Sequence, residues 1–236
     1  MAEPDDPVAP AIALSDVRFA WSGARRFSLT VDAFEVGRGE RLLLLGPSGS
    51  GKSTLLSLIC GIVTPQAGRV EVLGRNLPEL SGPRRDRFRA EHIGVIFQMF
   101  NLLPYGSVLD NVLLPLSFAP HRRQRAGAAE QEARRLLGAL GLDDDLLAAP
   151  AANLSVGQQQ RVAAARALIG RPDIVVADEP TSALDRARQD NFLDLLFGQV
   201  AAAGATLAMV SHDETLAARF DRVLALSSVL RAETAP

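Results

Sequence analysis

Short apolar stretches that alternate with helical patterns run along most of this chain. The stretches that have the length and composition of buried β-strands are residues 41–45, 93–97, 174–178, 205–210 and 221–226. Helical patterns at 157–170 and 187–203 separate the later stretches from one another. Because strands that alternate with helices build parallel sheets with covered faces, this order predicts an α/β fold with a mostly parallel sheet.

Two regions depart from this alternation. Residues 11–36 hold two β-type segments around the turn-like sequence SGARR, which predicts an N-terminal antiparallel β subdomain, and a further strand is expected at 68–73. From about residue 100 to 165, patterns rich in Leu, Ala and Arg and broken by prolines predict an α-helical subdomain inserted in the core. The expected organisation is a flexible leader at 1–10, a single domain at 11–230 and a tail at 231–236.

The composition is that of an ordinary globular protein. Of the 236 residues, 47% are hydrophobic and 22% are charged, and the net charge of −2 argues against a nucleic-acid partner. No apolar run reaches the roughly 18 residues of a membrane-spanning helix. The acidic, proline-rich N-terminus does not resemble a secretion signal, and the single cysteine, Cys60, lies in an apolar run. We therefore expect a cytoplasmic protein with a buried thiol.

Arginine supplies almost every cation in the chain. The 25 basic residues are 24 arginines and one lysine, Lys52. Guanidinium is a planar fork, whereas ammonium is a compact charge on a flexible stem. Lys52 is therefore a candidate for a position that requires the smaller cationic group.

A glycine-rich loop follows the first of the apolar strands after residue 40. Its residues fit the pattern G-x-x-x-x-G-K-[ST] and are Gly46, Pro47, Ser48, Gly49, Ser50, Gly51, Lys52 and Ser53, with Thr54 next. Glycines let backbone N–H groups turn toward an anion, and the helix that follows adds its positive N-terminal end. Lys52 can reach the β- and γ-phosphate oxygens, and the Ser53 hydroxyl can bind Mg²⁺. The loop predicts a nucleoside triphosphate site, against the alternative of a glycine-rich turn without a ligand.

Two adjacent carboxylates, Asp178 and Glu179, end the apolar strand at 174–178. Parallel strands deliver their C-terminal residues to the edge where ligands bind in open α/β sheets. Because side chains alternate along a strand, the two carboxylates are expected to have different roles. Asp178 is the candidate for Mg²⁺, and Glu179 for the general base that orients and deprotonates the attacking water. The alternative is that both residues only cap the next helix.

Further along the chain, the sequence LSVGQ at residues 154–158 resembles LSGGQ, the signature of the ABC ATPases. The phosphate loop, this signature and the strand that ends in Asp-Glu stand in that family's order and at its spacing. The resemblance covers residues 11–230. It implies a single ABC ATPase domain with a P-loop NTPase core that binds and hydrolyses ATP with Mg²⁺.

The resemblance gives roles to four further positions. Gln98 falls where the family has the glutamine that contacts Mg²⁺ or water, and His212 falls on the switch histidine that supports the γ-phosphate. Asp185 lies in the sequence SALD, which resembles the family's D-loop. Trp21 stands where the family stacks an aromatic ring on adenine. The family thus implies that Gln98 and His212 act in catalysis beside the lysine and the glutamate already named.

The signature begins a helical pattern, so a serine hydroxyl and free backbone N–H groups predict a second anion site, with candidates Ser155, Gly157 and Gln158. The resemblance implies that this site serves the ATP of a second copy of the chain in a head-to-tail dimer. Val156 departs from the family, which has glycine there. Valine is harmless if the position contacts phosphate only through its N–H, and slows hydrolysis if glycine geometry is needed. We favour the harmless alternative.

The segment RRDRFRAEHIGVIFQMFNLLP at residues 84–104 is similar to the branch of macrolide-efflux and lipoprotein-release ATPases, which work with a separate permease. That resemblance implies an ATP-hydrolysing subunit, peripheral on the cytoplasmic face of the cell membrane, that energises an integral membrane permease. The helical stretch at 100–150 is expected to carry the groove for the permease's cytoplasmic helix. Its candidate residues are Phe100, Leu102, Leu103 and Tyr105.

Three clusters of arginine, at residues 84–89, 122–125 and 134–135, are interpreted as solvated faces. Contact with the membrane surface is therefore expected only through the permease. Three other functions stay open: an importer ATPase, an ABC-type ATPase without a permease, as in iron–sulfur assembly, and an unrelated P-loop kinase. The glutamines after the signature and the segment at 84–104 favour transport, and the signature with His212 argues against a kinase.

Overall fold

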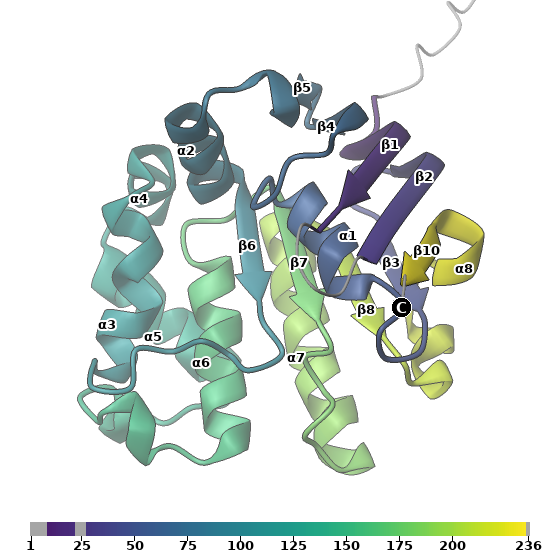
Figure 1. Ribbon diagram of the computed structural model, residues 1–236. Helices are drawn as coiled ribbons and strands as arrows, with labels where there is room; N and C mark the ends of the chain where they lie inside the picture. The colour runs from purple at the N-terminus through teal and green to yellow at the C-terminus, as the bar shows by residue number, and fades with distance from the viewer. Residues whose placement is uncertain (1–8, 22–26, 235–236) are drawn as a thin grey trace, which may run out of the picture.

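Two five-stranded sheets form the framework of the computed structural model, which describes residues 9–21 and 27–234 (Figure 1). The antiparallel sheet has the order β10-β2-β1-β4-β5 and consists of β1 (Ile12–Ala20), β2 (Phe27–Val36), β4 (Ala67–Val72), β5 (Arg75–Asn76) and β10 (Arg231–Thr234). The parallel sheet has the order β6-β7-β8-β3-β9 and consists of β3 (Arg41–Leu45), β6 (Ile93–Ile96), β7 (Ile174–Asp178), β8 (Thr206–Ser211) and β9 (Arg222–Ala225).

Helices cover the parallel sheet and fill the side of the molecule away from β1 and β2 (Figure 1). The α-helices are α1 (Lys52–Ile59), α2 (Gly82–His92), α3 (Val108–Leu113), α4 (Pro120–Ala126), α5 (Ala129–Ala139), α6 (Val156–Leu168), α7 (Arg186–Ala203) and α8 (Leu226–Val229). Short 3₁₀ helices are η1 (Leu77–Glu79), η2 (Leu114–Ser117), η3 (Asp144–Leu146), η4 (Ala151–Asn153) and η5 (Glu214–Arg219).

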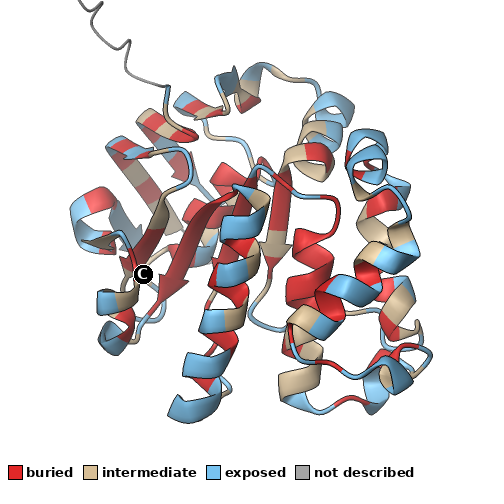
Figure 2. Ribbon diagram, turned by 180° about the vertical axis from the view of Figure 1, so that it is seen from behind, coloured by how far each residue is buried: buried red, intermediate tan, exposed pale blue. Residues whose placement is uncertain are grey.

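The strands β3, β6, β7 and β8 of the parallel sheet are among the most buried parts of the molecule, whereas the edge strand β9 is only partly buried (Figure 2). Leu42 and Leu44 of β3 belong to the core shared with the antiparallel sheet and α1, whereas Leu43 belongs to the core shared with α3 to α7. This alternation explains why the strands are continuous apolar runs in the sequence. Cys60 is buried in the first of these cores, as predicted, and burial raises the pKa of its thiol to about 12.

The helices α3 to α6 lie between β6 and β7 in the chain and form the predicted inserted helical subdomain. Because β6 and β7 are neighbours in the sheet, the chain leaves and re-enters the core at adjacent strands. The helix α6 packs so closely on β6 that a Cβ atom on Gly94 would overlap the carbonyl oxygen of Ala167. Glycine is therefore required at residue 94 for the helical subdomain to pack against the core.

The predicted tail at 231–236 is wrong for residues 231–234. These residues form β10, which pairs with β2 so that Arg231 lies opposite Thr30 and Thr234 opposite Phe27. The sequence RAET has no apolar alternation, and the strand forms because the edge of β2 offers backbone partners. Of the predicted leader, residues 1–8 lie outside the described residues, as does the turn sequence SGARR at 22–26.

The interpretation of the arginine clusters as solvated faces is wrong at Arg122, which is 1% exposed. Its guanidinium donates hydrogen bonds to the carbonyl oxygens of Ala167 (2.8 Å) and Ile169 (2.9 Å), at the end of α6. Burial is the main reason that the pKa of Arg122 falls to about 10. Free carbonyls at a helix end need donors, and a buried arginine supplies several at once.

Candidate active site

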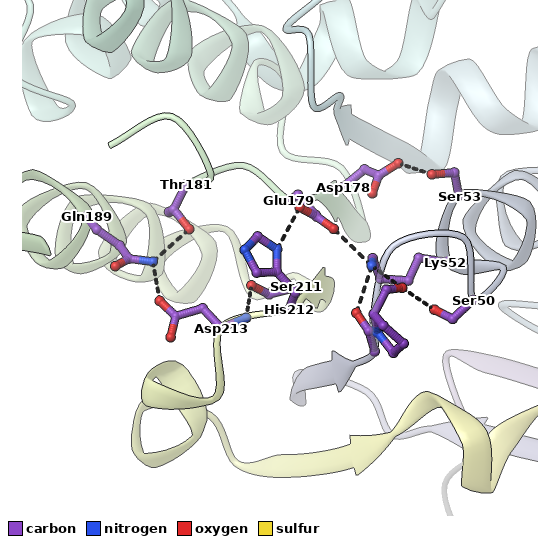
Figure 3. A network of polar contacts seen from close by, with 12 residues as sticks. Ser50, Lys52, Ser53, Asp178, Glu179, Thr181, Gln189, Ser211, His212 and Asp213 are labelled. Atoms are coloured by element: carbon purple, nitrogen blue, oxygen red, sulfur yellow. Dashed lines mark hydrogen bonds and ion pairs between the residues drawn. The ribbon is translucent and has the colours of Figure 1, made fainter. Parts of the chain in front are cut away.

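Three loops meet at the carboxyl-terminal edge of the parallel sheet (Figure 3). They follow β7, β8 and β3, which lie next to one another in the sheet. The register pairs Asp178 with Val210 and Leu45 with Ser211, so the three strands end at the same level. This register brings together the glycine-rich loop, the Asp178–Glu179 pair and His212, which are far apart in the sequence.

The loop after β3 folds around its own lysine. Gly49 and Gly51 have φ values of 80° and 98°, a left-handed range that glycine adopts readily. Lys52 is the first residue of α1, and its Nζ donates hydrogen bonds to the carbonyl oxygens of Gly46 (2.7 Å) and Pro47 (2.8 Å). The Lys52 side chain is only 7% exposed, so its ammonium group is buried inside the loop.

Lys52, Glu179 and His212 are linked in a row. The Nζ atom of Lys52 lies 3.0 Å from Oε1 of Glu179, and Nδ1 of His212 lies 2.9 Å from Oε2 of the same carboxylate. Burial alone would raise the pKa of Glu179, but the hydrogen bond and charge of Lys52, with help from His212, hold it below its usual range. Glu179 is therefore kept as a carboxylate, which is the form that a general base requires.

Asp178, the last residue of β7, contacts Ser53. The Ser53 hydroxyl donates a hydrogen bond of 2.7 Å to Oδ2 of Asp178. Burial, aided by the charge of Glu179, raises the pKa of Asp178 in spite of this hydrogen bond. The pKa values of the two neighbouring carboxylates are therefore shifted in opposite directions. Glu179 lies beyond the end of β7, so this difference does not come from alternation along the strand.

The pair of Ser53 and Asp178 fits Mg²⁺. This ion takes oxygen ligands, and in P-loop NTPases a hydroxyl and one carboxylate complete a shell of phosphate oxygens and waters. Within residues 9–21 and 27–234, no group of three His, Cys, Asp or Glu side chains is placed to hold a metal ion. Phosphate oxygens and water would supply the remaining ligands, with Gln98 as the further predicted contact.

A cavity of about 330 Å³ opens over these groups. Its lining residues are Phe27, Ser48, Gly49, Gly51, Lys52, Ser53, Thr54, Gln98, Asp178 and Glu179. The structure thus brings Gln98 to the phosphate loop and the carboxylates. The sequence does not indicate Phe27 as a lining residue, because an aromatic residue at the start of a strand carries no signal of its own.

Trp21 also lies beside the phosphate loop. Its indole Nε1 donates a hydrogen bond of 3.3 Å to the Thr54 hydroxyl, and its ring packs edge-on against Phe19 with centroids 5.1 Å apart. Trp21 is 45% exposed, so part of its surface is accessible to a ligand. Its role at adenine stays a prediction.

The predicted second anion site at the start of α6 is only partly as expected. Ser155 is the N-cap of α6, and its hydroxyl accepts a hydrogen bond from the backbone N–H of Gln158, while Oε1 of Gln158 accepts one from the backbone N–H of Ser155. This capping box uses the N–H groups of Ser155 and Gln158, whereas the Ser155 hydroxyl only accepts and can still donate its own proton to an anion. The N–H groups of Val156 and Gly157 lie in the first turn, which has no intrahelical acceptors for them.

Val156 begins α6 and therefore has the helical backbone that any residue adopts. It is not among the residues of the described chain with positive φ, and its side chain is 49% exposed. The backbone geometry agrees with the harmless alternative. Val156 and its neighbours in the signature do not line the cavity over Lys52. Asp185 does not line it either, and its side chain caps α7 by accepting a hydrogen bond from the backbone N–H of Arg188.

One family of known proteins matches this arrangement. The profile of the family described as "ABC transporter" matches residues 29–182, which include the phosphate loop, Gln98, the signature and the two carboxylates. The chain belongs to the ABC transporter family. The match ends before His212, so the contact of 2.9 Å between His212 and Glu179 extends the site beyond the matched segment.

Individual relatives refine this assignment. The chain is 47% identical over 191 residues to the uncharacterized ABC transporter ATP-binding protein YbbA of Escherichia coli K12. The alignment covers 81% of this chain and 82% of YbbA. It is 40% identical over 222 residues to the lipoprotein-releasing system ATP-binding protein LolD of Novosphingobium aromaticivorans. This alignment covers 92% of the present chain and 96% of LolD. The predicted similarity to the lipoprotein-release branch is confirmed.

A solved structure agrees with the fold. The post-hydrolysis dimer of the ATP-binding cassette MJ0796 with ADP and Pi matches with a TM-score of 0.80 at 33% identity, covering 91% of this chain and 93% of that one. The chain is therefore an ABC transporter ATP-binding subunit and an ATPase with a P-loop NTPase core, and the kinase alternative is wrong. Within the described ranges, no helix is both long and apolar enough to cross a membrane.

Proposed function

We propose that this chain is the ATPase of a lipoprotein-release-type ABC transporter and drives a separate membrane permease by closure of a head-to-tail dimer. The observation that carries this proposal is the division of the site. The phosphate loop, the two carboxylates and His212 converge within one chain, whereas the exposed start of α6 stays outside their cavity. A second copy that contributes this helix start would complete the shell around the γ-phosphate.

Each group of the assembled half has a chemical task in this proposal. Lys52 exchanges its contact with Glu179 for the β- and γ-phosphate oxygens when ATP enters, because both are anions within reach of one ammonium group. Ser53 and Asp178 would hold Mg²⁺, which neutralises phosphate charge. Glu179 then orients the attacking water and takes its proton, and His212 fixes the Glu179 carboxylate and reaches toward the γ-phosphate.

Trp21 binds the adenine of the nucleotide in this proposal, and Gln98 links the phosphate cavity to the permease. The exposed part of Trp21 stacks on adenine, because a planar base and an indole bury apolar area against each other. Gln98 lies between the phosphate cavity, which it lines, and the helical subdomain that follows β6. It is therefore placed to sense Mg²⁺ or the attacking water on one side and the permease on the other.

A second cleft is the proposed binding site for the permease's cytoplasmic helix. It has a volume of about 870 Å³ between α2, β6 and η2, and its lining includes Ile62, Ile93, Phe97 and Phe118 together with Arg87 and Arg89. Ile62 and Phe118 are 49% and 66% exposed. An amphipathic helix with an apolar ridge and acidic flanks fits such a surface. The lining does not include any of the four candidates expected at residues 100–105.

The ATP-binding relatives named after a lipoprotein-releasing system support transport over the alternative without a permease. On this proposal the chain is held at the cytoplasmic face of the membrane through its permease alone. The test is co-purification of the tagged chain from detergent-solubilised membranes of cells that express it. A stoichiometric integral membrane protein is expected, and its loss is expected for Phe118→Asp. Isolation of the chain without any membrane protein would favour the permease-free alternative.

A further inference from the structure

The side chain of Gln189 forms hydrogen bonds to two loops of the active site. Gln189 lies one turn into α7 and is 7% exposed. Its Nε2 atom donates one hydrogen bond to the Thr181 hydroxyl (3.0 Å) and another to Oδ2 of Asp213 (3.1 Å) (Figure 3). An amide nitrogen has two donors, and both are used here.

The two partners sit directly beyond the residues that are proposed to act on the γ-phosphate. Thr181 follows Glu179 by two positions, and Asp213 follows His212. Asp213 is itself fixed, because its Oδ1 accepts from the N–H of Thr215 and its own N–H donates to the Ser211 hydroxyl. Gln189 therefore connects a rigid turn after β8 to the loop after β7.

The loop after β7 needs such a connection. Pairing of β7 with β8 ends at Asp178 and Val210, and the last backbone bond between them runs from the N–H of Glu179 to the carbonyl of Val210. Glu179 has a φ of 44°, in the left-handed region that residues with a side chain rarely adopt. Beyond that point two buried glutamine side chains contact the loop after β7: Gln160, which donates to the carbonyl oxygen of Pro180, and Gln189. Of these two, Gln189 is the one that also contacts the loop after β8.

We propose that Gln189 is a positioning residue for ATP hydrolysis, which holds the Glu179 carboxylate against His212 by bridging Thr181 and Asp213. The proposal rests on the proposed roles of Glu179 and His212. Gln189 does not line the cavity over the phosphate loop, so it acts on the rate of hydrolysis rather than on ATP affinity.

The experiment exchanges the donor and the acceptor of the bridge. Gln189→Glu removes the amide donors and places a carboxylate beside Asp213, whereas the double variant Gln189→Glu/Asp213→Asn lets the new amide of residue 213 donate to the new carboxylate of residue 189. Thr181 can donate its hydroxyl to that carboxylate in turn. Gln199→Leu, on the same helix but away from the site, is the matched control for Gln189→Leu.

We expect Gln189→Leu and Gln189→Glu to lower kcat at least tenfold, with the ATP dissociation constant from calorimetry unchanged within twofold. The double variant is expected to return kcat to within threefold of the unmodified protein, and Gln199→Leu to leave it unchanged. All rates are measured well below the unfolding temperature of each variant. A double variant no faster than Gln189→Glu, or a Gln189→Leu variant with normal kcat, would overturn the proposal.

The same assay separates this proposal from the one on which it rests. Undiminished turnover of Glu179→Gln would remove the general base and with it the proposed function. An inactive Glu179→Gln beside a fully active Gln189→Leu would remove only the role of Gln189.

Discussion

The phosphate-loop half of the site and the signature half differ in how far one chain completes them. Around Lys52, charged and polar groups from three loops already contact one another at 2.7 to 3.0 Å. At the start of α6, Ser155 and Gln158 satisfy each other in a capping box, and the exposed side chain beside them is Val156. This chain thus assembles the phosphate-loop half by itself and leaves the signature half exposed, where the proposed function places a second copy.

The largest effect is expected from Lys52→Ala in the assembled half. Loss of a charge-assisted contact to phosphate costs about 1.5–3 kcal/mol, so ATP affinity is expected to fall on the order of 10- to 100-fold. Calorimetric titration with Mg-ATP measures this loss. Lys52→Arg is the sharper control, because a planar guanidinium cannot follow the path of the compact ammonium between Gly46 and Pro47. Normal affinity in Lys52→Arg would show that the single lysine is not required.

Ser155→Ala probes the signature half of the comparison. We expect ATP affinity of the single chain to stay the same while kcat falls about tenfold, because the altered helix start serves only the closed dimer. The unfolding free energy is expected to drop by about 1 kcal/mol through loss of the N-cap. An ATP dissociation constant raised as much as in Lys52→Ala would contradict the division into two halves.

The two neighbouring carboxylates predict stability changes of opposite sign. The pKa of Glu179 is lowered in the folded chain, so it stabilises the protein above its ordinary pKa and the effect is lost as the pH falls. The pKa of Asp178 is raised, chiefly by burial, so its charge destabilises the nucleotide-free protein near neutral pH.

At pH 7 we therefore expect Glu179→Gln to lower the thermal unfolding midpoint and Asp178→Asn to raise it, each by a few degrees. Both differences are expected to shrink as the pH is lowered. That of Asp178→Asn shrinks as the pH falls through the raised pKa of Asp178, and that of Glu179→Gln shrinks only below the ordinary pKa of a glutamate. Shifts of the same sign for both variants would contradict the opposite pKa shifts described for the two side chains.

Trp21 gives a smaller, optical signal. It is the only tryptophan, so its fluorescence reports on the proposed adenine contact without labelling. Mg-ATP is expected to change the emission intensity with a midpoint equal to the calorimetric dissociation constant. A flat titration at saturating nucleotide would remove Trp21 from the adenine site.

The smallest effect is expected from Val156→Gly. Because Val156 already has helical backbone geometry, restoring glycine is expected to change ATPase turnover less than threefold. Turnover raised at least tenfold would revive the alternative in which glycine geometry is needed.

The sequence predicted the parts of the site that depend on backbone pattern. The runs at 41–45 and 174–178 coincide with β3 and β7, because fully buried parallel strands are continuous apolar segments. It did not predict β10, the burial of Arg122 or the bridge of Gln189. These depend on partners far away in the chain, such as the edge of β2 or the end of α6, and the residues themselves have ordinary polar patterns.

The central claim, that two copies share each nucleotide, is tested most directly by the molar mass of Glu179→Gln in solution. Light scattering after size-exclusion chromatography is run without nucleotide and with saturating Mg-ATP, and Ser155→Arg is added to Glu179→Gln as the control that blocks the signature half. The account predicts the 25.2 kDa monomer without nucleotide, twice that mass with Mg-ATP, and monomer again in the control. A Glu179→Gln protein that binds Mg-ATP by calorimetry and still elutes as a monomer would contradict it.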